Sequence, residues 1–193
     1  MKTGIAGGIG SGKSYVCKLL AKRGINVYDC DDAAKRLMRT DEQLKEQLTK
    51  LIGPQTYVDG RLNKAAVATF LLSSEANARA IDAIVHPAVF RDFEESGLLW
   101  MESAIMFESG ADRYVDNVVV VTAPEEVRIE RIMKRDGISR EKAQEGMQRQ
   151  WPQEKVRQLA QYEIINDGRQ NLDSQIADLL QKLSNTRNTH QLL

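Results

Sequence analysis

The residues best suited to chemistry lie near the N-terminus. Residues 7–14 read GGIGSGKS, which fits the pattern G-x-x-x-x-G-K-[ST]. A loop that wraps phosphate oxygens must turn its N–H groups inward, and glycine tolerates the required torsions best. In this pattern the lysine can bridge the β- and γ-phosphates, and the hydroxyl after it can ligate Mg²⁺. We therefore expect Lys13 and Ser14 to serve a nucleoside triphosphate, ATP, and its Mg²⁺.

A glycine-rich turn without a ligand could match the same pattern by chance. The flanking sequence argues against this, because an apolar strand is expected at residues 2–6 and an amphipathic helix at residues 12–23. That helix would present its positive N-terminal end to the phosphates. The expected nucleotide contacts in this segment are Gly8, Ile9, Gly10, Ser11, Gly12, Lys13, Ser14 and Tyr15.

The surrounding pattern predicts an α/β fold with a parallel sheet. A second strand at residues 25–29 completes a β-loop-α-β opening. Further strands are expected at residues 98–104, 118–122 and 163–166, and four consecutive valines in one of them suit a strand buried on both faces. Helices are expected at residues 125–135, 140–149 and 173–183.

A chain of 193 residues suits a single domain, and its parts are expected to differ in role. The core comprises about residues 1–31, 98–123 and 160–185. Residues 32–97 are almost wholly helical and are expected to form an insertion, interrupted at His86-Pro87, that binds the acceptor. Residues 124–159 are expected to form a lid.

Composition excludes several classes of protein. Lys plus Arg equals Asp plus Glu, at 27 each, so no general basic field is expected to attract nucleic acid. No apolar run is long enough to span a bilayer, and the N-terminus does not read as a signal peptide. The two cysteines do not have a metal-ligand spacing. We expect a cytoplasmic protein that binds neither nucleic acid nor membrane.

Two other classes of nucleotide-binding protein fit less well. A GTPase switch should carry an N/T-K-x-D motif, but the Asn63-Lys64 pair is followed by two alanines. Large motor and helicase ATPases need a longer chain. A small phosphotransferase remains.

Three aspartates follow the second predicted strand. Ligands of open α/β sheets bind beyond the carboxyl ends of the strands, so these carboxylates are expected near the phosphates. Asp29 and Asp31 are the candidates for orienting or deprotonating an acceptor hydroxyl, or for holding the metal. Asp32 is expected to serve only as a helix N-cap.

Arginines are concentrated after the valine-rich strand. Lids of small kinases use arginines to neutralise the transferring phosphoryl group. Arg135 and Arg140 flank the predicted helix-to-helix turn and are the two we assign this role. A solvated helix face explains most of the others, which include Arg128 and Arg131. Residues 163–168 could lie beside the base, although from the residues alone an ordinary strand-to-helix turn is the better interpretation.

These segments together resemble the dephospho-coenzyme A kinase family, from about residue 3 to residue 183. The similar segments are the GGIGSGKS loop, VYDCD at 27–31, DGRLNK at 59–64, His86-Pro87, IMFE at 105–108, Arg135-Asp136 followed by Ser139, Gln150 and Lys155, and INDG at 165–168. Each is weak alone, but together they follow the order of the family.

The resemblance implies a P-loop three-layer α/β/α core with a parallel sheet, a helical substrate-binding insertion and a helical lid. The implied reaction phosphorylates the ribose 3′-hydroxyl of dephospho-coenzyme A with ATP. Another small-metabolite or nucleoside monophosphate kinase is the alternative, because it would share the phosphate loop and the lid arginines.

The resemblance also implies roles for individual residues. It makes Asp31 the base, and it places His86, Phe107 and Glu108 near the acceptor and Asn166 and Gly168 near adenine. Together with the arguments from the residues above, the predicted catalytic residues are Asp31, Lys13 and Arg140, and the predicted metal residues are Ser14 and Asp29.

Three positions depart from the family pattern. Tyr15 replaces a common threonine, Ala104 replaces a proline before the IMFE segment, and Gly146 replaces a frequent arginine in the second lid helix. His86 also has a simpler interpretation, because a residue before proline is pushed out of the helical region and could mark a kink.

Overall fold

The computed structural model describes the backbone of residues 1–190 and the side chains of residues 1–186. The chain forms two compact units. The first contains Met1–Tyr28 and the chain from Leu98 onward, and the second is Asp29–Gly97.

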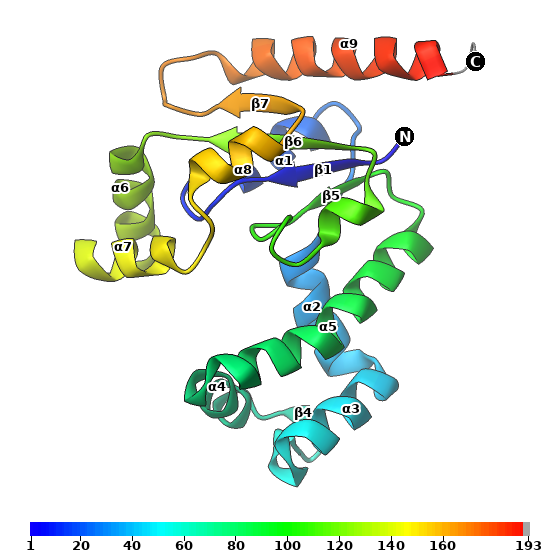
Figure 1. The fold of residues 1–193 in the computed structure, drawn as a ribbon, viewed down its shortest axis with the longest axis vertical. Helices are drawn as coiled ribbons and strands as arrows, with labels where there is room; N and C mark the ends of the chain where they lie inside the picture. The colour runs from blue at the N-terminus through cyan, green and yellow to red at the C-terminus, as the bar shows by residue number, and fades with distance from the viewer. Residues whose placement is uncertain (191–193) are drawn as a thin grey trace. The chain divides into compact units, whose positions relative to one another are not determined.

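A five-stranded sheet forms the centre of the first unit (Figure 1). Its order is β2 (Val27–Asp29), β5 (Trp100–Glu102), β1 (Thr3–Ala6), β6 (Asn117–Thr122) and β7 (Tyr162–Ile165). The pairs β1–β5, β1–β6 and β6–β7 are parallel. This confirms the predicted α/β class, and it brings the carboxyl ends of these strands to one edge of the sheet.

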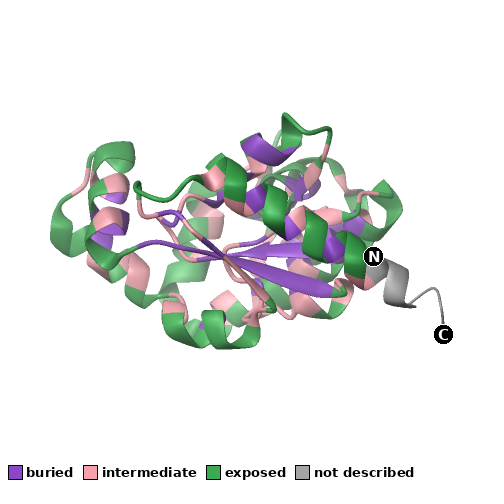
Figure 2. Cartoon of the chain, turned by 90° about the horizontal axis from the view of Figure 1, so that it is seen from above, coloured by how far each residue is buried: buried purple, intermediate pink, exposed green. Residues whose placement is uncertain are grey.

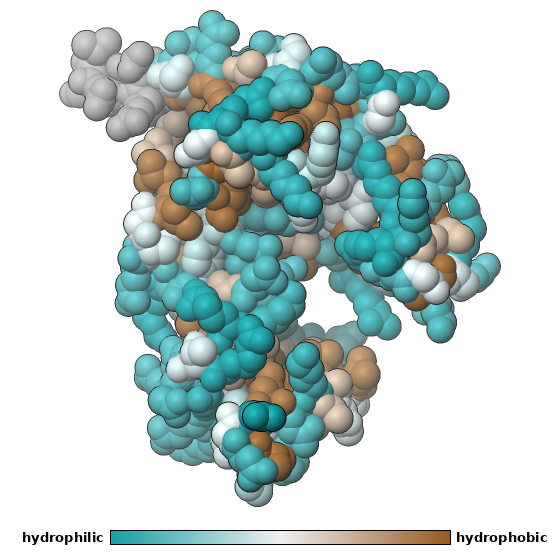
Figure 3. Space-filling model, turned by 180° about the vertical axis from the view of Figure 1, so that it is seen from behind, coloured by the Kyte–Doolittle hydropathy of each residue, from teal (hydrophilic) through white to brown (hydrophobic). Residues whose placement is uncertain are grey.

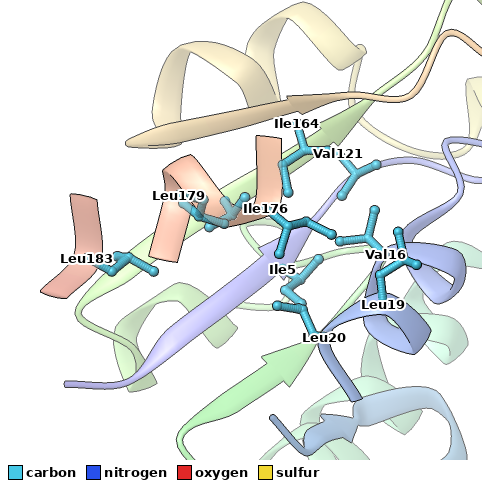
Figure 4. Packing of buried hydrophobic residues seen from close by; sticks show 10 residues of the cluster. Ile5, Val16, Leu19, Leu20, Val121, Ile164, Ile176, Leu179 and Leu183 are labelled. Atoms are coloured by element: carbon cyan, nitrogen blue, oxygen red, sulfur yellow. The ribbon is translucent and has the colours of Figure 1, made fainter. Parts of the chain in front are cut away.

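Burial follows the apolar runs of the sequence. Every residue of β1 and β6 is buried, as the valine-rich run predicted (Figure 2). On one face of the sheet, side chains of the strands pack against α1 (Lys13–Ala21) and α9 (Leu172–His190). Ile5, Val121 and Ile164 meet Leu20 and Ile176 in this cluster (Figure 4). Each such side chain contributes roughly 1.5–3 kcal/mol when fully buried.

The first unit also carries η2 (Ala111–Tyr114), α6 (Glu125–Asp136), α7 (Arg140–Gln148) and α8 (Gln153–Leu159). The paired helices α6 and α7 have a small core of their own, formed by Ile129, Ile132 and Ala143. Ile9 of the glycine-rich loop packs against this core. The helix pair is therefore in direct contact with the candidate phosphate site.

The second unit is helical, as predicted for residues 32–97. It contains α2 (Cys30–Thr40), α3 (Glu42–Ile52), η1 (Pro54–Thr56), α4 (Lys64–Ser73) and α5 (Glu75–Ser96). The strands β3 (Tyr57–Val58) and β4 (Arg61–Leu62) form a short hairpin around the expected turn at Asp59-Gly60.

The interruption expected at His86-Pro87 is wrong. Helix α5 runs through Pro87 without a break. Buried side chains lie on both sides of the proline, including Ile81 and Val85 before it and Val89 and Phe93 after it. Their packing holds the helix together although proline removes one backbone hydrogen bond.

The visible surface is mostly hydrophilic, with smaller hydrophobic groups between (Figure 3). Across the described residues, none of the helices combines the length and apolar character that crossing a membrane would need.

Candidate active site

The glycine-rich loop connects β1 to α1 and depends on left-handed backbone torsions. Gly7, Gly10 and Gly12 have φ values of 141°, 80° and 92°. Space is restricted as well, because a Cβ on Gly12 would overlap Asn166 Nδ2 and a Cβ on Gly7 would overlap the Val121 carbonyl oxygen. Gly12 gives α1 no side-chain cap, so the first N–H groups of the helix remain available to an anion.

Lys13 lies buried at the start of α1, with a carboxylate opposite it. Its Nζ is 3.7 Å from Glu102 Oε1. Glu102 ends β5, the strand beside β1, and its Oε2 accepts a hydrogen bond from Cys17 Sγ at 3.5 Å. Glu102 is not among the site residues predicted from the sequence. An acid within the predicted strand at residues 98–104, near its carboxyl end, was the signal that could have found it.

Asn166 follows β7 and hydrogen-bonds to the backbone of the glycine-rich loop. The end of β7 positions it, and its backbone N–H donates to Thr122 O at 2.8 Å. Its side chain is buried and donates from Nδ2 to Ser11 O at 2.9 Å. The predicted role of Asn166 at adenine is therefore accompanied by a structural one. Gly168 lies in the exposed turn that follows, at φ 80°.

Arg131 contacts the same carbonyl edge of the loop. Its Nη1 lies 3.4 Å from Gly10 O and 3.3 Å from Ser11 O, and its Nη2 donates to Asn166 Oδ1 at 3.3 Å. The assignment of Arg131 to a solvated helix face is wrong, because α6 packs beside the loop.

Arg128 and Gln150 hold Ile9 between them. Arg128 Nε donates to Ile9 O at 2.9 Å, and Gln150 Oε1 accepts from Ile9 N at 2.8 Å. Gln150 Nε2 also reaches Ala104 O at 3.4 Å. Arg128 is buried, and that burial lowers the pKa of its guanidinium. The solvated-face assignment is wrong for Arg128 also. The spacing of 128, 131 and 135, one turn apart, was the available signal.

The two arginines selected from the sequence lie elsewhere. Arg135 forms a two-point pair with Asp136, at 2.7 and 2.8 Å. Arg140 Nη2 donates to both oxygens of Glu126, at 2.6 and 2.8 Å. These hydrogen bonds raise the pKa of both arginines and lower that of both carboxyls. In this structure both guanidinium groups are neutralised by acids of α6, and their predicted phosphate contacts remain a prediction.

Phe107 and Glu108 face the connection between α7 and α8. Glu108 Oε1 accepts from Trp151 N at 3.0 Å. Phe107 and Trp151 both line a pocket of about 360 Å³, and Gln161, the residue before β7, lines it as well. The structure thus gives both residues local partners, and their predicted nearness to the acceptor remains a prediction.

The aspartates of the second unit have different local roles. Asp29, rather than Asp32, is the N-cap of α2, and its Oδ1 accepts from Asp32 N at 3.0 Å. The prediction that Asp32 is the N-cap is wrong. Helix α2 starts at Cys30, so Asp32 already lies in its first turn. Asp32 instead pairs with Lys35 at 3.0 Å. Asp31 is exposed, and its carboxylate makes no hydrogen bond or ion pair with a described residue.

His86 also has partners within the second unit. It is half-buried on α5, 3.7 Å from Asp82 Oδ1, and its ring lies 6.0 Å from that of Phe90. These contacts fit a residue that packs one helix, so its predicted contact with the acceptor rests on the sequence resemblance.

Comparisons with known proteins agree with this geometry. The family model of dephospho-CoA kinase matches residues 1–171. Dephospho-CoA kinase of Bacteroides fragilis is 38% identical over 187 residues, covering 93% of this chain and 91% of its own. The crystal structure of TT1252 from Thermus thermophilus superposes with a TM-score of 0.82 at 33% identity, covering 94% of this chain and 96% of its own.

A more distant structure supports the fold alone. Dephospho-CoA kinase from Campylobacter jejuni superposes with a TM-score of 0.66 at 18% identity, covering 97% of this chain and all of its own. The structure contains a glycine-rich loop with a buried lysine on a parallel sheet. The same chain matches one family model over residues 1–171. The chain belongs to the dephospho-CoA kinase family.

Proposed function

We propose that this chain transfers the γ-phosphoryl group of ATP to the ribose 3′-hydroxyl of dephospho-coenzyme A in the cytoplasm, giving coenzyme A and ADP. The observation that carries the proposal is the buried Lys13 at the uncapped start of α1, within a loop held on its outer side by Arg128, Arg131 and Asn166. A loop fixed in advance can aim its N–H groups at phosphate without reorganising during the reaction.

Lys13 would neutralise the β- and γ-phosphates as negative charge shifts toward the leaving oxygen. In the structure its Nζ is 3.7 Å from Glu102, which holds the ammonium within reach of the loop. Nucleotide phosphates would compete with that carboxylate for the ammonium, and phosphate groups are the stronger anionic partner in total charge.

The oxygen groups at this end of the sheet fit Mg²⁺. Ser14 is exposed at the first turn of α1, and Glu102 ends β5 within 3.7 Å of Lys13. Asp29 belongs to the second unit, and its role at the metal remains a prediction from the sequence. The described residues contain no group of three or more His, Cys, Asp or Glu side chains that could hold a metal. This agrees with Mg²⁺ chemistry, since that ion usually takes one or two protein oxygens and completes its shell with phosphate and water. When bound, it would neutralise charge on the β- and γ-phosphates.

Asp31 is the residue that we assign to the acceptor hydroxyl. Its carboxylate is exposed and uncommitted, whereas Asp29 already caps α2 and Asp32 already pairs with Lys35. A free carboxylate can align a hydroxyl for in-line attack and take its proton. The assignment also rests on the match of residues 27–31 to the family pattern.

The proposed reaction is tested by ATP turnover with a panel of acceptors. We expect ADP to form with dephospho-coenzyme A and only slowly with AMP, CMP or shikimate. Mass spectrometry should place the new phosphate on the ribose 3′ position. Faster turnover with AMP than with dephospho-coenzyme A would overturn the proposed acceptor but leave the phosphate site intact.

A further inference from the structure

A second pocket, of about 430 Å³, lies on the flank of the glycine-rich loop. It is lined by residues from α6, from α7, from the connection between α7 and α8 and from the first residue of α8, and by no residue of the loop itself. The lining residues are Glu125, Arg128, Gln144, Met147, Gln148, Gln150, Trp151, Pro152 and Gln153. Its wall contains no residue of the cradle formed by Gly12, Lys13 and the first turn of α1, although Arg128 Nη2 lies close against Gly8 at the start of the loop.

Arg128 gives this pocket a buried positive charge that Glu125 of the wall only partly offsets. Only 6% of the residue is exposed, and no carboxylate of the described residues forms an ion pair with it. Its Nε is used by Ile9 O, and its two Nη groups make no hydrogen bond with a described residue. Burial lowers the pKa of this guanidinium, and the negative charge of Glu125, which raises it, is the smaller effect.

Other lining groups define what could supply the counter-charge. The amides of Gln144 and Gln148 make no hydrogen bond with a described residue, so they can donate to an oxyanion. Gln153 Oε1 is already used by Ala123 N at 3.1 Å. Glu125 is the one acidic residue of the wall, and its charge disfavours a bulky polyanion.

We propose that this pocket binds a small oxyanion, a single phosphate or carboxylate group, through the two Nη groups of Arg128. Guanidinium presents paired donors that match both groups. The site also has a direct connection to the loop, since Arg128 and Gln150 both hydrogen-bond to the backbone of Ile9. An anion on Arg128 would therefore fix the side chain that holds Ile9. The inference does not depend on which acceptor the enzyme phosphorylates.

The test uses Trp151 as a reporter. The chain has two tryptophans, so Trp100→Phe leaves Trp151, in the pocket wall, as the single source of indole fluorescence. Lys13→Ala is added to weaken phosphate binding in the loop. Inorganic phosphate is titrated at constant ionic strength, with acetate as a separate carboxylate probe. We expect a saturable change in Trp151 fluorescence with at least one of the two anions.

Charge-matched variants decide whether Arg128 is the ligand. Arg128→Gln should weaken the apparent affinity by about tenfold to a hundredfold, which is typical of losing a charged hydrogen-bond partner. Lys134→Gln removes one charge from an exposed position of the same helix and should leave the affinity unchanged. Arg128→Lys keeps the charge and should bind more tightly than Arg128→Gln.

Two results would overturn the inference. One is the absence of a saturable response to either anion in the Trp100→Phe, Lys13→Ala protein. Arg128 is intact in that protein, so this result cannot be attributed to a folding defect caused by a change at Arg128. The other is an equal affinity in Arg128→Gln and Lys134→Gln proteins whose circular dichroism matches that of the parent.

Discussion

Asn166 Nδ2 donates to the carbonyl oxygen of Ser11 at 2.9 Å, joining two residues that are 155 positions apart. Asn166 is buried, and its Oδ1 accepts from Arg131 at 3.3 Å. The polypeptide after the last strand of the sheet thus fixes the carbonyl side of the phosphate loop. The N–H groups of this loop are the ones predicted to bind the nucleotide phosphates.

Asn166→Ala should lower both stability and nucleotide affinity. The change removes one of the two donors to the Ser11 carbonyl oxygen and leaves Arg131 as the other, so the lost hydrogen bond should cost roughly 0.5–1.5 kcal/mol. Urea denaturation measures the loss of unfolding free energy, and the KM for ATP should rise. Gln158→Ala, on the exposed side of α8, is the control and should change neither quantity. An unchanged midpoint for Asn166→Ala would mean that this hydrogen bond contributes nothing.

Lys13→Ala should abolish most turnover without unfolding the protein. Removing one preorganised electrostatic group typically lowers kcat by about 10²–10³. Lys18→Ala removes an exposed lysine from the same helix and should retain activity. Steady-state kinetics and circular dichroism distinguish the two effects. Near-normal kcat in folded Lys13→Ala would contradict the role assigned to this lysine.

The three aspartates at the junction of β2 and α2 should separate into one catalytic residue, Asp31, one structural residue, Asp29, and one with neither role, Asp32. Asp31→Asn should keep its stability and its ATP affinity but lose most of its turnover. Asp29→Ala should lose about 1 kcal/mol of unfolding free energy, because the cap of α2 is removed. Asp32→Asn removes only an exposed pair with Lys35 and should be close to wild type.

The measurement compares kcat at saturating ATP, Mg²⁺ and acceptor, together with chemical denaturation. For the kinetic comparison Asp29→Asn is used, because an asparagine can still cap the helix. If Asp31→Asn turns over like the wild type while Asp29→Asn does not, the role at the hydroxyl or the metal belongs to Asp29.

Arg140 is predicted to act on the phosphoryl group only after it leaves Glu126. Arg140→Ala should therefore lower kcat more than it raises the KM for ATP. Glu126→Gln should leave kcat at least as high as in the wild type. Because the pair is exposed, neither change should shift the unfolding free energy measurably. An effect of Arg140→Ala confined to KM would remove the transition-state role.

Two glycines of the α6–α7 helix pair should respond oppositely to alanine. An added Cβ meets no atom within 4 Å at Gly146 or at Gly137. Gly146 lies inside α7, where alanine should stabilise the protein by about 0.5–1 kcal/mol. Gly137 caps α6 at φ 65°, where alanine is strained and should destabilise it. Thermal unfolding should show a higher Tm for Gly146→Ala and a lower Tm for Gly137→Ala. Shifts of Tm in the same direction would contradict this prediction.

Local sequence determined the phosphate loop and the elements beside it. The GGIGSGKS motif requires glycine torsions that the structure shows at Gly7, Gly10 and Gly12. The valine-rich run became a fully buried strand, and the helical spacing of residues 125–135 became α6. These features depend on residues close in the chain, so periodicity and residue type suffice to predict them.

Helix boundaries and interruptions were less well determined. The cap of α2 is Asp29 rather than Asp32, and α5 continues through Pro87. Either aspartate could have capped the helix from its residue type alone. Proline opposes helix locally, but the buried side chains on both sides of it outweigh that preference, and their packing partners come from other elements of the unit.

The partners of the charged residues were decided only by the tertiary structure. Sequence reasoning selected Arg135 and Arg140 from their place beside a turn, yet both pair with acids of α6. Arg128 and Arg131 contact the loop because parallel pairing of β1 with β6 brings the start of α6 beside residues 9–11. Glu102 meets Lys13 because β5 is the neighbour of β1. A spacing pattern shows which residues share a helix face, whereas strand order determines what that face meets.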